Sequence, residues 1–250
     1  MRGLALGDDL SALLRLLKHS DANVRRSAAM ALKNFGAEAV HAIPALIRAL
    51  DDADINTQIA VTHRLSEMGP AAVPGLLQAL AKPEKQVRRE ATWALTRIGS
   101  GAKLAVPALI AALRDADLKV RLGAAQALGA IGPNAAEAIP SLINCLKDSN
   151  LIFCRLAAQA LTRVGPEALA ALHEASQSAD SYVRREALWA LGHMGERTDD
   201  FLTPVISSDQ ASETPDQFAA RRGGTADVKT TVPIPVRSKD IEKTTIVKLD

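Results

Sequence analysis

The sequence predicts an all-α protein in which about six helix pairs stack into an α-solenoid. Three observations lead to this fold class. Apolar residues recur with the 3.6-residue period of an amphipathic helix through most of the chain. Glycines end these segments at intervals of 33, 30, 33, 33 and 30 residues, which identifies a repeat protein. Hydrophobic residues make up 48% of the chain but aromatics only 3%, so its interior must consist of Ala, Leu, Ile and Val.

The second helix of each predicted pair is clearest at residues 87–99. Val87, Ala91 and Leu95 fall on one face of a helix, and Gly99 follows as a residue that can adopt a left-handed conformation at the helix end. The same pattern recurs along the chain, so we expect six such helices. They end at Gly36, Gly69, Gly99, Gly132, Gly165 and Gly195.

A shorter apolar segment precedes each of these helices and is predicted to be the first helix of the pair. The segments are residues 10–17, 43–50, 73–80, 106–113, 139–146 and 168–172. Between the two helices lies a polar turn whose last residue can accept hydrogen bonds from the first N–H groups of the second helix. The expected N-caps are Asp21, Asp54, Glu84, Asp117, Asn150 and Asp180. Glu84 is the weakest of them.

Repeated units of this kind resemble a known family. Ile-Pro-x-Leu-Ile followed by Asp-x-x-Val-Arg-x-x-Ala-x-x-Ala-Leu-x-x-Ile-Gly is similar to HEAT repeats, and the nearest type is the bacterial phycobilisome-lyase HEAT-like subclass. The resemblance covers roughly residues 4 to 199. It implies a right-handed α-solenoid whose second helices line a concave face.

Two domains are expected, a solenoid at residues 1–199 and a tail at residues 200–250. A shift of 96 residues superimposes repeats one to three on repeats four to six and places Trp93 on Trp189, which indicates a duplicated block, 4–99 and 100–195. The 30-residue units lack three residues between the glycine and the next helix. The tail lacks helical periodicity and is predicted to be disordered. Within it, residues 231–236 and 244–249 are either binding motifs or inert chain.

Arginines lie at the start of the second helices, where a positive charge opposes the helix macrodipole and needs an acidic partner. The resemblance implies a structural Asp–Arg ladder between adjacent turns. A ridge that binds phosphate or acidic groups is the alternative. The ladder residues are Arg25, Arg88, Arg121, Arg184, Asp52, Asp115, Asp117, Asp148 and Asp180.

Trp93 and Trp189 occupy the same position in their repeats, six residues before the glycine, beside the buried face. Arg89 and Arg97 flank Trp93, and Arg185 and His193 flank Trp189. Trp and Arg are frequent in binding hot spots, so these six residues are the candidate partner-binding site on the concave face. Packing of each tryptophan against the next repeat is the competing interpretation.

No catalytic, metal or cofactor site is predicted. Deoxyhypusine hydroxylases, which are HEAT-like enzymes, hold iron with His-Glu pairs at second-helix starts, but here the matching places carry Arg89-Glu90 and Arg185-Glu186, and arginine cannot ligate a metal. Cys145 falls on a core position, and Cys154 is expected to be a surface thiol. A bilin lyase activity follows only from the name of the subclass.

The predicted function is a non-enzymatic scaffold or adaptor that binds another protein on the concave face. An enzyme or enzyme subunit, bilin lyase-like or hydroxylase-like, is the first alternative, and a nucleic-acid binder using the arginine ridge is the second. A net charge of +2 makes nucleic acid an unlikely partner. No apolar run reaches the about 20 residues that a membrane-spanning helix needs, so no membrane partner is expected. The presence of only two cysteines fits a location in the reducing cytoplasm. Leu10, Leu13, Leu14 and Leu17 have no preceding repeat to cover them, which suggests self-association through the N-terminal repeat.

Overall fold

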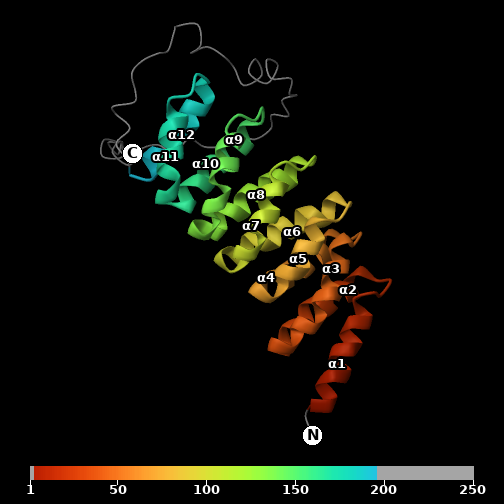
Figure 1. Ribbon diagram of the computed structural model, residues 1–250. Coiled ribbons are helices and arrows are strands. Elements are labelled where there is room, and N and C mark those ends of the chain that lie inside the picture. Colours follow the sequence, from red (N-terminus) through yellow and green to blue (C-terminus); the bar gives the residue numbers. More distant parts are fainter. Residues whose placement is uncertain (1–2, 196–250) are drawn as a thin grey trace, which may run out of the picture.

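A computed structural model describes residues 3–195 of the chain, and the predicted tail at 200–250 lies outside the described residues. The described part forms twelve α-helices and contains no strand (Figure 1). The first helices of the pairs are α1 (Gly3–Leu16), α3 (Ile43–Arg48), α5 (Val73–Leu80), α7 (Val106–Ala112), α9 (Ile139–Cys145) and α11 (Leu169–Ser176). The second helices are α2 (Ala22–Ala31), α4 (Ile55–Glu67), α6 (Lys85–Ile98), α8 (Leu118–Ile131), α10 (Leu151–Val164) and α12 (Ser181–His193).

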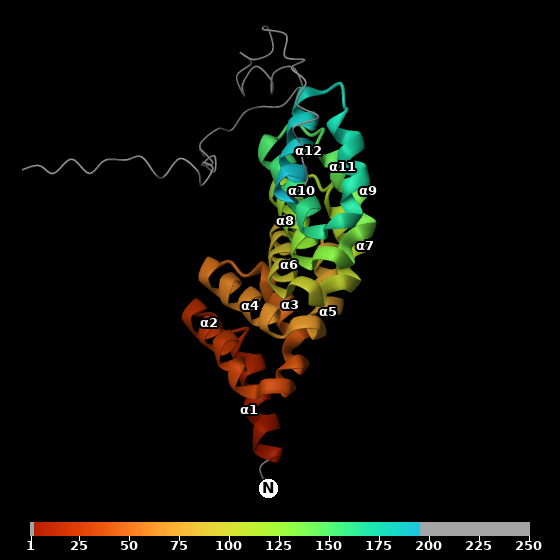
Figure 2. The same ribbon diagram turned by 90° about the vertical axis from the view of Figure 1, so that its left-hand side faces the viewer.

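The six pairs stack side by side into an α-solenoid of two layers. The second helices form one layer and the first helices α3 to α11 form the other (Figure 2). Extensive contacts connect elements of the same repeat or of adjacent repeats, as between α6 and α8 or between α8 and α10. The predicted fold class is confirmed in this part of the chain.

The core between the layers consists mainly of leucine and alanine. Each second helix contributes one leucine that is 0% exposed, at the residue just after its end in the case of α2: Leu32, Leu65, Leu95, Leu128, Leu161 and Leu191. Burying a leucine side chain contributes about 1.5–3 kcal/mol, so one such residue in every repeat is a large part of the stability of each unit. Alanines such as Ala91 and Ala124 fill the remaining contact surface and let neighbouring helices approach closely.

All six predicted end glycines have a positive φ, from 51° to 99°. The second dihedral differs from the expected left-handed helical value, since ψ is −132° at Gly99 and −138° at Gly132. This region of backbone space is open essentially only to glycine. At Gly36, Gly69, Gly99, Gly132 and Gly165 the glycine therefore does more than end the helix, because it also turns the chain within or into a 3₁₀ segment.

The 3₁₀ segments were not expected from the sequence. They are η1 (Leu32–Ala42), η2 (Ala49–Asp51), η3 (Gly69–Ala72), η4 (Gly99–Ala105), η5 (Gly132–Ala138) and η6 (Pro166–Ala168). Five of them connect one repeat to the next, and η2 extends α3. The three residues missing from the 30-residue intervals are missing here, since η3 and η6 are shorter than η4 and η5.

Side chains at the predicted N-caps begin the second helices. Asp21, Asp54, Asp117, Asn150 and Asp180 each accept a hydrogen bond from a backbone N–H of the first turn. Glu84 makes no such bond, as expected for the weakest candidate.

The fourth residue after each N-cap closes the turn between the two helices, and we call it the turn-closing position. Its side chain contacts the carbonyl oxygen of the residue six places earlier, at 2.8 Å for Arg25, 2.9 Å for Arg121 and 2.6 Å for Arg184. The six residues at this position are Arg25, Gln58, Arg88, Arg121, Cys154 and Arg184. Carbonyls left unpaired near the end of the first helix attract positive charge, which offsets the unfavourable macrodipole of the second helix.

Candidate functional site

The second helices form one layer of the solenoid (Figure 2). Their residues at the fifth, ninth and thirteenth positions after the N-cap form a stripe along each helix, and in repeats three to six all of them are half-buried or exposed. We call this surface the second-helix face, and it is the surface expected to be concave. In repeats three to six it carries Arg89, Trp93, Arg97, Leu122, Gln126, Ala130, Arg155, Gln159, Arg163, Arg185, Trp189 and His193.

Trp93 is an exposed aromatic residue on this face, with 39% of its surface accessible. The guanidinium carbon of Arg97 lies over its ring, 5.1 Å from the ring centroid, which is a cation–π distance. The Nε of Arg97 donates to the hydroxyl of Ser66 in the preceding repeat at 3.1 Å, so this arginine is held in place. Arg89 points elsewhere and pairs with Asp117 of the following repeat.

Trp189 has a different environment. Its side chain packs against the core, and the guanidinium carbon of Arg155 lies 4.3 Å from its ring centroid. The ring centroids of His193 and Trp189 are 3.9 Å apart. Arg185 is directed to the ring of Tyr182 at 4.7 Å and to Glu186 rather than to the tryptophan. The two tryptophans occupy the same position in their repeats, but Trp93 is exposed and Trp189 is half-buried. The contact of Arg155 with the Trp189 ring was not predicted from the sequence.

Three ion pairs connect adjacent repeats at the turns. Arg25 donates two hydrogen bonds to Asp52, at 2.6 and 2.7 Å, and Arg88 donates two to Asp115, at 2.7 and 2.9 Å. Arg89 pairs with Asp117 in the same bidentate way. Hydrogen bonds from the guanidinium groups hold the pKa of Asp52 and of Asp115 below the usual value and lower that of Asp117 to about 2.

The remaining residues of the expected ladder have different contacts. Arg121 and Arg184 donate to backbone carbonyls of their own turns through the turn-closing contact. Asp148 accepts a hydrogen bond from the N–H of Asn150 at 2.8 Å, and Asp180 caps α12. The ladder is therefore interrupted, since its three ion pairs join repeats one and two and repeats three and four only, within the described part of the chain.

The two glutamates of the Arg-Glu sequences are both engaged by neighbouring side chains. Glu186 is only 3% exposed and is paired with Arg155 at 2.7 Å and with Arg185 at 3.2 Å. Glu90 accepts hydrogen bonds from the hydroxyl of Thr62 and from Gln86, both at 2.9 Å. Within residues 3–195 no three His, Cys, Asp or Glu side chains are grouped so that they could hold a metal ion.

Both cysteines are buried, so the expectation that Cys154 is a surface thiol was wrong. Its sulfur lies 3.4 Å from the carbonyl oxygen of Cys145, inside the turn of repeat five. Burial raises the pKa of the Cys145 thiol to about 11, which keeps it protonated and unreactive near neutral pH.

The N-terminal end of the array is less open than the sequence indicated. Leu10 and Leu17 are buried within the first repeat, so the expectation that they are uncovered was wrong, while Leu16 remains 38% exposed. A shallow apolar groove between α1 and α2 is lined by Leu13, Leu16, Asn23, Val24, Ser27, Ala28 and Ala31.

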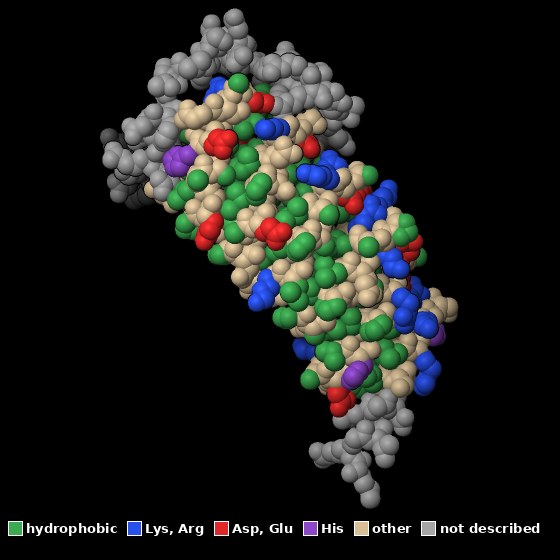
Figure 3. Space-filling view, viewed as in Figure 1, with side chains coloured by type: hydrophobic (Ala, Val, Ile, Leu, Met, Phe, Trp, Pro, Cys, Tyr) green, Lys and Arg blue, Asp and Glu red, His purple; other side chains and the backbone are tan. Residues whose placement is uncertain are grey.

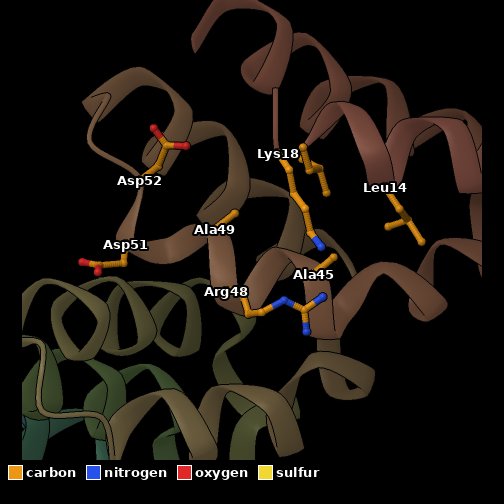
Figure 4. A pocket seen from close by; sticks show the side chains of 8 residues that line it. Leu14, Lys18, Ala45, Arg48, Ala49, Asp51 and Asp52 are labelled. Carbon is orange, nitrogen blue, oxygen red and sulfur yellow. The ribbon is translucent and has the colours of Figure 1, made fainter. Parts of the chain in front are cut away.

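A second groove, between α1 and α3, has a volume of about 280 Å³. Figure 4 shows that the side chains of Lys18 and Arg48 both extend into it, while Asp51 lies at the far side.

The first-helix side of the molecule carries few charges. Hydrophobic and uncharged side chains cover most of the surface in Figure 3, and Lys and Arg gather along the edge formed by the turns within the repeats. No helix among residues 3–195 has both the length and the apolar composition that crossing a bilayer requires.

Comparison with known proteins identifies the repeats. A family model described as HEAT repeats matches residues 10–74, 73–162 and 139–217. No curated protein matches. The complex of CpcE and CpcF of phycocyanin lyase from Nostoc sp. PCC7120 is 27% identical, with a TM-score of 0.48 over 74% of this chain and 77% of that chain.

Two further solved structures are similar to this chain. An engineered protein is 25% identical, with a TM-score of 0.47 over 75% of this chain and 96% of that one. A mutant of Kap121p is 16% identical, with a TM-score of 0.53 over 76% of this chain and 26% of that one. At 16% identity the similarity to Kap121p indicates the fold alone, and the chemistry of the site has to be argued from this chain's own residues.

Proposed function

Because this chain belongs to the HEAT-repeat family, we propose that it is a non-enzymatic scaffold or adaptor that binds a partner protein through its second-helix face. Each repeat adds one helix to this face, so the array offers a long continuous surface. We place this activity in the cytoplasm, because a chain with only two cysteines lacks a disulfide scaffold and fits a reducing compartment.

The observation that carries this proposal is the pair formed by Trp93 and Arg97. Trp93 is 39% exposed, so part of its apolar surface remains for a partner to cover, and covering it would contribute to binding. The stacked Arg97 is already ordered by Ser66 at 3.1 Å, so binding would cost little side-chain entropy. Exposed Trp with ordered Arg is the composition typical of interface hot spots.

Affinity capture from native lysate, followed by mass spectrometry, tests the proposal. The full chain should retain one or a few proteins, and Trp93→Ala should lose them. Leu104→Ala is the matched control, because Leu104 is 70% exposed in η4 and lies outside the second-helix face.

Nuclease treatment and elemental analysis of the captured material distinguish the other classes. Retention that depends on nucleic acid would favour a nucleic-acid binder, and a recovered bilin or metal would favour an enzyme. Either result, or equal capture by the Trp93→Ala variant, would contradict the scaffold proposal.

A further inference from the structure

Arg97 and Arg163 occupy the same place in repeats three and five, thirteen residues after the N-cap, and both are exposed on the second-helix face. Neither forms an ion pair with another residue of the described part of the chain. Their neighbours differ in this respect, since Arg89 pairs with Asp117 and Arg155 pairs with Glu186. The two guanidinium groups therefore have hydrogen-bond donors available for a ligand.

Both arginines lean over the preceding repeat in the same way. Arg97 reaches Ser66 of α4, and the Cδ of Arg163 lies 3.5 Å from the point where a Cβ at Gly129 of α8 would stand. Ser66 and Gly129 are equivalent residues, twelve positions after the N-cap of their repeats. The arrangement is thus repeated with an interval of two repeats.

Between the two arginines, repeat four contributes no charge to the stripe. Its three positions hold Leu122, Gln126 and Ala130, of which Leu122 and Ala130 are half-buried. Across repeats three to five, the thirteenth positions and the stripe of repeat four therefore present a cation, a neutral surface and a second cation.

We propose that this part of the second-helix face binds an extended acidic peptide segment of a partner protein, with one carboxylate on Arg97 and a second on Arg163. The inference rests on the proposed function and specifies the chemistry of the partner. Packed helices lie about 8–10 Å apart, so two junctions separate the arginines by roughly 16–20 Å. An extended chain advances about 3.3–3.6 Å per residue, which sets the two acidic residues about five positions apart.

A peptide fits this surface better than a nucleic acid does. Asp117 neutralises Arg89 and Glu186 neutralises Arg155, so the face offers separate cations rather than the continuous positive surface that a polyanion requires. Two separate guanidinium groups can instead each take one carboxylate in a bidentate pair. The whole chain has a formal net charge of only +2, which provides little general attraction for phosphate backbones.

Fluorescence anisotropy of labelled synthetic peptides, with the full chain at low salt, tests the proposal. The probe carries two glutamates five positions apart, with four Ala and Pro residues between them. Two companion peptides carry the glutamates one position and nine positions apart. The first probe should bind most tightly. Arg97→Gln and Arg163→Gln should each raise its Kd about threefold to fivefold, the range for exposed ion pairs. Arg114→Gln is the matched control, since it removes an exposed arginine from the turn edge and should leave Kd unchanged.

The position of the peptide can be read from Trp93. Trp93 and Trp189 are the only tryptophans of the chain, so a Trp189→Phe variant emits from Trp93 alone, and the probe should change that emission. Equal Kd values for all three spacings, or an equal effect of Arg114→Gln, would overturn the proposal. The proposal would also be overturned if single-stranded DNA bound more tightly than the first peptide probe. If lysate capture depends on Trp93 but not on Arg97 or Arg163, the scaffold function survives and the acidic-peptide inference fails.

Discussion

The thiol of Cys154 lies 3.2 Å from the carbonyl oxygen of Asp148, six residues earlier in the chain. In repeats four and six the same place is taken by Arg121 and Arg184, whose guanidinium groups donate to the equivalent carbonyl. A buried cysteine thus replaces an arginine at a turn-closing position while keeping the direction of the contact. The geometry of the turn requires a donor there, and the donor need not be charged.

The strength of this contact should depend on the donor. A guanidinium bonded to two carbonyls is a stronger donor than a thiol. Arg121→Ala should therefore lower the free energy of unfolding by about 2 kcal/mol, and Cys154→Ala by about 1 kcal/mol or less. Urea denaturation followed by circular dichroism measures both. A larger loss for Cys154→Ala than for Arg121→Ala would show that packing, rather than the hydrogen bond, determines the residue at this position.

Acid should weaken the array through its ion pairs. The folded pKa of Asp117 is about 2, below the usual value of about 3.9 for an unfolded chain. A lowered pKa gives stability that is fully present above about pH 4 and is lost as the pH falls towards about 2. The urea midpoint should fall through this window, and Arg89→Gln should make the fall shallower because Asp117 then loses its partner. An unchanged pH profile in the variant would contradict this assignment.

The two tryptophans should respond differently to truncation. Trp93→Ala should change the free energy of unfolding by less than about 1 kcal/mol, because the ring is already exposed. Trp189→Ala should cost about 2 kcal/mol, because that ring packs on the core under Arg155. Denaturant melts of the two variants test the difference. Equal losses would mean that Trp93 is also a packing residue, which would weaken the proposed binding role.

The contact between α6 and α8 should tolerate no added methyl group at Gly123. A Cβ there would lie 2.2 Å from the hydroxyl oxygen of Thr92 and 2.8 Å from its Cβ. Gly123→Ala should therefore destabilise the fold by about 1–3 kcal/mol through overpacking, although alanine is the better helix former. Adding Thr92→Ala should recover part of the loss. A stabilised single variant would show that the two helices can move apart freely.

Purified protein should contain no stoichiometric iron or zinc. Arg89 and Arg185 stand where the iron-binding HEAT-like enzymes carry histidine, and Glu186 is already paired with two arginines. Elemental analysis of protein purified without chelators is the measurement. About one metal ion or more per chain would contradict the prediction.

The repeat architecture could be predicted because it depends on local rules that recur in every unit. A glycine follows each second helix, and an N-cap residue precedes each one, usually Asp or Asn. Gly99 and Asp117 could therefore be identified from their spacing alone. The same repetition also made visible the three missing residues of the 30-residue units, which the structure places in η3 and η6. Their 3₁₀ geometry was less visible, because short i→i+3 segments leave little periodicity in a sequence.

The site was harder to predict because side-chain direction depends on the neighbouring repeat. Arg89 and Arg97 both flank Trp93 in sequence, yet only Arg97 stacks on the ring, since Asp117 of the next repeat draws Arg89 away. Arg155 reaches Trp189 from another helix and leaves no local signal. Cys154 was misassigned for a similar reason, because the turn-closing contact became apparent only when the six repeats could be compared in three dimensions.

Extensive contacts connect only adjacent repeats in the described part of the chain, so the array is elastic along its length, like a spring. A small rotation at one junction costs little there, yet the five junctions act in series, so their rotations add up along the length of the molecule. Ion pairs stiffen the junctions between repeats one and two, three and four, and five and six, so the junctions between them should bend more easily. A partner that binds repeats three and five would change the distance between them. The curvature of the free protein therefore need not equal the curvature of the complex.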